Sequence, residues 1–248
     1  MSAGERQGCG DAVARQGVPS LVWRAGQERR LAMLAAHTRL QEARVLIAGC
    51  GLGLYAQQIQ ERYAAEVLAF DLALGHAEAA RQRITSAFCA AVEGIPLPDG
   101  TIDTVLSHEV LEHTEDDGVA VREMIRVLRV GGRLALFAPN RWYPFETHGH
   151  YWGGRYHFGN TPLINYLPDR WRNRLAPHVR SYRRRDLQAL WETQAVKVVQ
   201  ERRIFGAYDN WLARWGRWAR PLLALQGLEG SRLDFWALSH FVVLEKCA

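Results

Sequence analysis

The stretch RVLIAGCGLG, residues 44–53, constrains the fold of this chain more than any other segment. Its apolar first half predicts a buried strand of a parallel sheet, and Leu54 to Tyr63 predicts a helix soon after it. Between the two stand Gly49, Gly51 and Gly53. Glycine permits positive φ angles and a close approach of a ligand to the main chain, and a helix N-terminus offers unpaired N–H groups. The stretch therefore predicts a nucleotide-like ligand at a strand-to-helix turn.

Apolar runs alternate with helical patterns through the first half of the chain and again near its C-terminus. The expected strands are 44–48, 66–70, 86–92, 102–107, 133–140, 195–205 and 236–247, and the expected helices are 54–63, 77–85, 115–132 and 183–194. This alternation predicts a doubly wound, Rossmann-like α/β fold that binds its ligand over the carboxyl ends of the strands. We expect seven strands, mostly parallel with an antiparallel last strand. Insertions follow strand five and separate strands six and seven.

The length of 248 residues suits one domain. We expect a disordered lead-in over 1–20 and a single domain over 21–248, in which 141–182 and 205–233 are substrate-lid or cap insertions. The sequence contains no apolar run of membrane-spanning length. Four scattered cysteines without a CxxC pair favour reduced thiols, and hence the cytoplasm.

Charge is distributed unevenly along the chain. Residues 1–140 carry a formal charge of −3, whereas residues 141–248 carry +8 and eight of the nine tryptophans. A basic, aromatic second half suits nucleic acid, an anionic membrane surface or an acidic substrate. Since no recognised RNA-binding module is present, we do not expect a nucleic-acid partner.

The glycine spacing distinguishes between two classes of nucleotide-like ligand. A dinucleotide fingerprint is G-x-G-x-x-G, but the third glycine position here is Leu54, and the observed spacing is G-x-G-x-G. Asp71, twenty residues after Gly51, fits either class because a carboxylate accepts hydrogen bonds from two ribose hydroxyls.

Two further segments follow the turn in a recognisable order. They are VEGIPLPDGTIDTVLSHEVLEH and MIRVLRVGGRLALFAPN, and with RVLIAGCGLG and Asp71 they cover about residues 40–140. In these motifs the chain resembles the class I S-adenosylmethionine-dependent methyltransferases, in particular the small-molecule group called type 11. The resemblance implies S-adenosylmethionine as cofactor and S-adenosylhomocysteine as product.

The same resemblance implies a set of cofactor-binding residues. Gly49, Gly51 and Gly53 would border the cofactor, Asp71 and Leu72 would lie at the ribose, Val92 and Glu93 at the adenine, and Ser107 and His108 at the methionine end. Two positions depart from the family pattern. An acidic residue usually precedes the glycine turn, where this chain has Ala48, and an Asp often lies near the adenine, where this chain has Ala91.

The insertion 141–182 begins with an aromatic and histidine-rich segment directly after strand five. We expect it to be a substrate lid in which Trp142, Tyr143, Phe145, Tyr151 and Trp152 contact an apolar acceptor. His148 or His150 would be the general base, because the pKa of histidine lies near neutrality. A packed Ω-loop is the alternative. Glu146, His148 and His150 also resemble a metal-binding set, but the glycines among them do not suit a strand, so the sequence predicts no metal site.

The second insertion contains Trp211, Trp215, Trp218 and Leu222 at helical spacing, with arginines on another face. It is either a cap packed on the domain or an interfacial helix over 209–225 that makes peripheral contact with a membrane. His113 is expected to pack at the start of a helix rather than to catalyse.

These features together predict a methyltransferase that methylates a small, largely apolar acceptor, most favourably at oxygen. Lipid-like, isoprenoid-like or polyketide-like acceptors suit the tryptophan-rich, basic second half. The alternatives are methylation of RNA or protein, or a regulatory protein that binds S-adenosylmethionine without catalysis. The oligomeric state stays open.

Overall fold

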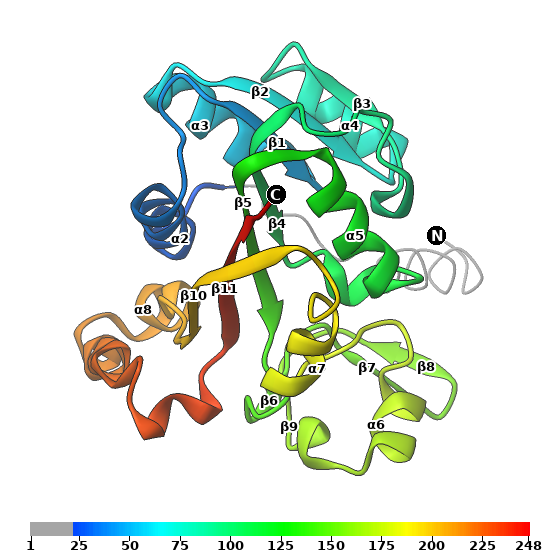
Figure 1. Ribbon diagram of the computed structural model, residues 1–248. Helices are drawn as coiled ribbons and strands as arrows, with labels where there is room; N and C mark the ends of the chain where they lie inside the picture. Colours follow the sequence, from blue (N-terminus) through cyan, green and yellow to red (C-terminus); the bar gives the residue numbers. More distant parts are fainter. Residues whose placement is uncertain (1–21) are drawn as a thin grey trace.

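The seven-stranded sheet has the order β10-β11-β5-β4-β1-β2-β3 in a computed structural model that describes residues 22–248 (Figure 1). Its strands are β1 Arg44–Ala48, β2 Glu66–Asp71, β3 Ala87–Cys89, β4 Ile102–His108, β5 Leu128–Pro139, β10 Val196–Ile204 and β11 Ser239–Lys246. Only β11 is antiparallel to its neighbours β5 and β10. The expected mostly parallel sheet with an antiparallel last strand is confirmed. The expected lead-in 1–20 lies outside the described residues.

The central strand β1 brings three strand ends to one edge of the sheet. Ala48, its last residue, is paired with Phe70 of β2 and with Ser107 of β4. Because all three strands are parallel, their carboxyl ends open onto a common space, which is where open α/β sheets bind ligands.

Helices cover both faces of the sheet, and each face has its own apolar core. On one face α2 (Ala25–His37) and α3 (Leu54–Tyr63) pack against Val45 and Ile47 of β1. On the other, α5 (Asp117–Val127) and α7 (Arg184–Ala189) pack around Leu46. This division follows from the alternation of side chains along a strand.

Four helices differ from the sequence expectation. The helix expected at 115–132 is α5, which ends at Val127, and β5 begins directly after it at Leu128. The helix expected at 77–85 is α4, Leu74–Arg81, and α7 ends at Ala189 instead of continuing to 194. In each of α4 and α7, an apolar residue shortly after the helix is buried: Ile84 after α4 and Trp191 after α7. The apolar spacing in the sequence therefore continues beyond the end of the helix. The helix α2 was not predicted.

Both insertions extend beyond the same end of the sheet (Figure 1). The first contains β6 Phe145–Glu146, β7 His150–Trp152, β8 Arg155–His157, β9 Thr161–Pro162, the 3-10 turn η3 Ile164–Tyr166 and α6 Asp169–Leu175. The second contains α8 Asp209–Trp215 and the 3-10 segments η4 Gly216–Leu228 and η5 Arg232–Trp236.

The second insertion is not one continuous helix. Gly216 has a φ of 51° and ends α8, so the expected single face of tryptophans and Leu222 is broken there. Trp211, Trp215 and Trp218 are 53%, 54% and 77% exposed, which contradicts a cap that buries its tryptophans. Among residues 22–248, no helix combines the length and the apolar character needed to cross a membrane.

Candidate functional site

A cavity of about 870 Å³ lies where the strand ends meet the two insertions. This size is within the usual range of small-molecule sites, roughly 300–1,000 Å³. Its wall is built from α2, the glycine turn, the ends of β2 and β4, residues 90–93, the first insertion and residues 205–211. One cavity therefore joins the predicted cofactor residues to the predicted lid.

The glycine turn is tightly packed against the end of β4. Gly49 has a φ of 69°, and a Cβ atom there would lie 2.3 Å from Cγ2 of Val110. Gly53 is the left-handed N-cap of α3, where a Cβ would lie 3.0 Å from the backbone of Ala80. Side chains are thus excluded at both positions, for reasons of backbone conformation and of space.

Asp71 connects the end of β2 to this turn. Its Oδ2 accepts a hydrogen bond from the Gly51 N–H at 2.8 Å, and its Oδ1 accepts one from the Ala73 N–H at 3.0 Å. The Nδ1 atom of His76 lies 3.1 Å from Oδ1. Since each carboxylate oxygen has two lone pairs, Oδ2 can still accept one further bond from a ligand in the cavity.

Most of the predicted cofactor residues lie in the cavity wall. They are Gly49, Gly51, Asp71, Leu72, Val92, Glu93 and His108. Within residues 22–248, the wall leaves out Gly53, which packs on α4, and Ser107, which is buried. Burial raises the pKa of the Cys50 thiol to about 12, so it is not a reactive nucleophile.

The structure corrects which residue before the turn faces the cavity. Ala48 is fully buried in the core on the α5 face, whereas Ile47, one residue earlier, lines the cavity. Of these two residues, Ile47 is therefore the one whose side chain could meet a ligand in the cavity.

Arg30 of α2 is a cavity residue that the sequence did not indicate. Its guanidinium donates to Nε2 of His108 and to Oγ of Ser239, and lies 3.3 Å from a carboxylate oxygen of Glu109. Burial and the charge of Arg30 lower the pKa of His108 to about 3, so this imidazole is neutral and can accept the bond. Only the apolar spacing of Leu31 and Leu34 could have revealed the helix that carries Arg30.

The lid contributes a different set of side chains from the one predicted. Tyr143 and His148 line the cavity, together with Thr147, Tyr156 and Phe158. Five predicted lid residues are described by the structure but do not line this cavity: Trp142, Phe145, His150, Tyr151 and Trp152. Trp152 is 67% exposed, and His150 stacks on His157 within the β7–β8 hairpin.

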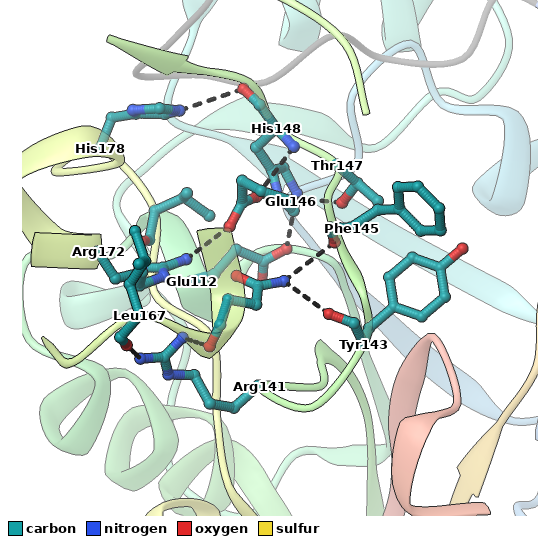
Figure 2. A network of polar contacts seen from close by, with 12 residues as sticks. Glu112, Arg141, Tyr143, Phe145, Glu146, Thr147, His148, Leu167, Arg172 and His178 are labelled. Carbon is teal, nitrogen blue, oxygen red and sulfur yellow. Dashed lines mark hydrogen bonds and ion pairs between the residues drawn. The ribbon is translucent and has the colours of Figure 1, made fainter. Parts of the chain in front are cut away.

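His148 lies between two carboxylates, as Figure 2 shows. Its Nδ1 is 3.2 Å from Oε1 of Glu146, and its Nε2 is 3.5 Å from Oε1 of Glu112. Arg172 fixes Glu146 from the other side through a 2.8 Å bond to Oε2. Burial alone would lower the pKa of His148, but the two carboxylates raise it to about 10, so the imidazole is charged at neutral pH.

Two more residues join His148 from the 3-10 turn η2 (Leu111–His113), which follows β4. Glu112 is 1% exposed, and burial raises its pKa to about 7. Burial, and then the charge of His148, lowers the pKa of His113 to about 4. Glu109 interacts with both Glu112 and His148, and its backbone has a left-handed φ of 54°. Strained backbone at a non-glycine residue is concentrated at functional sites.

Comparison with known proteins finds a methyltransferase domain in the first half of the chain. Residues 46–136 match the family described as "Methyltransferase domain". Over 100 residues the chain is 38% identical to a Mycobacterium tuberculosis protein described as "Probable S-adenosylmethionine-dependent methyltransferase". Residues 46–136 therefore form a methyltransferase domain, which is similar to those of S-adenosylmethionine-dependent methyltransferases.

The chain is also similar in sequence to a second relative and in fold to a solved methyltransferase structure. The chain is 37% identical over 113 residues to malonyl-acyl-carrier-protein O-methyltransferase of Serratia marcescens. These alignments cover 39% and 45% of this chain, but only 36% and 42% of the relatives' own lengths. An S-adenosylmethionine-dependent methyltransferase structure from Mesorhizobium loti aligns over 90% of this chain and 98% of its own, with a TM-score of 0.64 at 19% identity. This structural similarity supports the fold over 90% of the chain.

Proposed function

We propose that this methyltransferase transfers a methyl group from S-adenosylmethionine to an oxygen atom of a small, largely apolar acceptor. The observation that carries the proposal is the single cavity, in which the glycine turn and Asp71 share a wall with Tyr143 and His148. A cofactor at one end and an acceptor at the other would meet inside it. In such a site the protein acts mainly by orienting the reactants and excluding water.

The proposal gives the cofactor one direction in the cavity. The glycine turn passes beneath the ribose and methionine part, Asp71 accepts bonds from the ribose hydroxyls, and Val92 and Glu93 border the adenine. At the other end, Arg30 supplies a cation for the methionine carboxylate. Charged hydrogen bonds of this kind contribute about 1.5–3 kcal/mol each.

The acceptor end is lined by tyrosines, Phe158 and His148, which suits an apolar molecule with one polar oxygen. The Serratia relative is likewise named an O-methyltransferase. Of the two predicted bases, His148 is the one in the cavity wall and His150 is not. Because the His148 imidazole is charged at neutral pH, we assign it to stabilising negative charge on the acceptor oxygen and not to removing the proton.

Methyl-labelled S-adenosylmethionine tests this proposal with three acceptor classes: an acyl thioester with a free carboxylate, a prenylated phenol, and total RNA. We expect label in one of the first two, and slower transfer by His148→Ala but not by His150→Ala. Label found only in RNA or in protein would support those alternatives instead. Cofactor binding without transfer to any acceptor would favour a regulatory protein.

A second candidate property is contact with an anionic membrane. It rests on the exposure of Trp211, Trp215 and Trp218, two of which lie against arginines: Arg214 over Trp215 and Arg217 over Trp218. Exposed tryptophans beside basic groups are typical of interfacial segments. An apolar acceptor held in a membrane would then reach the cavity, whose wall includes Trp211.

A further inference from the structure

Glu112, His113 and His148 form a compact group of nitrogen and oxygen donors in the acceptor half of the cavity. One donor atom from each lies within 4.8 Å of the other two. His113 and His148 both line the cavity, so the group is reachable from it. The three residues come from two distant segments, η2 after β4 and the first insertion, which the fold brings together.

Hydrogen bonding within the protein leaves these donors unused. Neither Oε1 nor Oε2 of Glu112 has a hydrogen-bond partner among the described residues, although the side chain is 0% exposed. The Nδ1 atom of His113 is also buried there without a hydrogen-bond partner. Buried polar groups are almost always hydrogen-bonded, so several buried atoms without a hydrogen bond at one point, with only the 3.5 Å ion pair from His148 to Oε1 beside them, indicate a ligand.

The orientation of His148 supports a metal ion as that ligand. Its Nδ1 faces Glu146, which Arg172 holds in place, and this leaves Nε2 directed toward Glu112. Metal-binding histidines characteristically donate their second N–H to a carboxylate in this way. The 3.5 Å between Nε2 and Oε1 is long for a hydrogen bond. It is close to the ~3.4 Å edge of a tetrahedral site with ~2.1 Å bonds.

We propose that Glu112, His113 and His148 bind one divalent first-row transition metal ion. Two imidazoles and one carboxylate suit Mn²⁺, Fe²⁺, Co²⁺ or Zn²⁺ better than the oxygen-preferring Mg²⁺ or Ca²⁺. The ion replaces the proton that His148 shares with the carboxylates. Glu109, adjacent to Glu112, adds negative charge that favours a cation.

Three protein ligands leave coordination positions open toward the cavity, as in catalytic rather than structural sites. The role of the ion rests on the proposed function. A hydroxyl oxygen of the acceptor binds the ion, which lowers the pKa of that hydroxyl. Its proton leaves to solvent, the oxygen–methyl bond forms while the sulfur–methyl bond breaks, and the sulfonium becomes a thioether. The acceptor class is therefore a hydroxyl compound, such as an alcohol or a phenol.

Titration of the untagged, metal-free full chain with Co²⁺, followed by visible absorption, tests the site without substrate. We expect one strongly bound Co²⁺ per chain and binding at least about tenfold weaker in both His148→Asn and Glu112→Gln. His150→Asn is the matched control and should bind as the wild type does, because His150 lies outside the group. Thermal melts confirm folding, and either variant alone suffices if the other does not fold.

Three results would overturn the proposal: no stoichiometric Co²⁺ binding, equal binding by wild type and both variants, or loss of binding in His150→Asn alone. S-adenosylhomocysteine binding is measured in parallel on the same preparations. If it fails while Co²⁺ still binds, the proposed function is wrong and the metal site stands. If it succeeds without Co²⁺ binding, the metal site is wrong.

Discussion

The Oδ2 atom of Asp71 accepts a 2.8 Å hydrogen bond from the N–H of Gly51. The residue that we assign to the cofactor's ribose is thus also the residue that fixes the glycine turn. A carboxylate held in this way is preorganised, so little conformational entropy is lost when a ligand binds to it.

Asp71→Ala is expected to weaken S-adenosylhomocysteine binding by about 10- to 100-fold, because charged hydrogen bonds of about 1.5–3 kcal/mol are lost. Isothermal titration calorimetry measures the effect. Glu78→Ala, an exposed change on the neighbouring helix α4, should leave the dissociation constant unchanged. An unchanged constant for Asp71→Ala would contradict the assignment.

Arg30→Gln is expected to weaken S-adenosylhomocysteine binding by a similar factor but to leave 5′-methylthioadenosine binding unchanged. The second ligand has no amino-acid carboxylate, so it cannot use the guanidinium. Both affinities are measured by calorimetry on the same preparation. Equal losses for the two ligands would show that Arg30 acts through its bonds to His108 and Ser239, and not on the carboxylate.

Most of the fold was predictable because periodicity and turn chemistry report local structure directly. The buried run before Gly49 and the helix after Gly53 were predicted at their observed bounds. Helix ends such as Arg81 and Ala189 were not, since tertiary packing buries apolar residues beyond them. The short strands of the first insertion depend on cross-strand pairing between two- and three-residue segments, which leaves no periodic pattern.

Most of the cavity wall that we assign to the cofactor was predictable because its residues follow strand ends in sequence, whereas Arg30 on the unpredicted helix α2 was not. The acceptor half was not. Tyr143 was predicted and lies in the cavity wall, whereas Trp152, two residues after His150, is exposed at the tip of a hairpin. The contact between His148 and Glu112 depends on how the first insertion folds back over β4, and no local pattern encodes that.

The free energy of unfolding is expected to fall as the pH is lowered from 7 to 5, partly through His240. This side chain is 2% exposed and contacts the Tyr182 carbonyl at 2.9 Å, and burial lowers its pKa to about 4. In the unfolded chain the pKa is about 6.5, so the unfolded state binds the extra proton first. The contribution lost by pH 5 is about 2 kcal/mol.

Urea denaturation at several pH values measures this loss. His240→Asn should be less stable than the wild type at pH 7 but should lose about 2 kcal/mol less between pH 7 and 5. His157→Asn, at an exposed site, should keep the wild-type pH dependence. If His240→Asn shows the full wild-type loss, the buried imidazole does not cause it.

The double variant Trp215→Ser and Trp218→Ser is expected to sediment less with phosphatidylserine-containing vesicles than the wild type at low salt. Both tryptophan insertion and attraction of the nearby arginines act there. Trp152→Ser, which removes an equally exposed tryptophan from the other insertion, should sediment as the wild type does. A wild-type chain that never sediments would rule out the membrane contact.

The most direct test of the central claim is calorimetric titration of the wild-type chain with S-adenosylhomocysteine and, separately, with NAD⁺. Gly49, Gly51 and Asp71 line the cavity, and the G-x-G-x-G turn lacks the third glycine of a dinucleotide fingerprint. We predict one S-adenosylhomocysteine bound per chain and no measurable NAD⁺ binding. Binding of NAD⁺ in preference, or of neither ligand, would contradict the account.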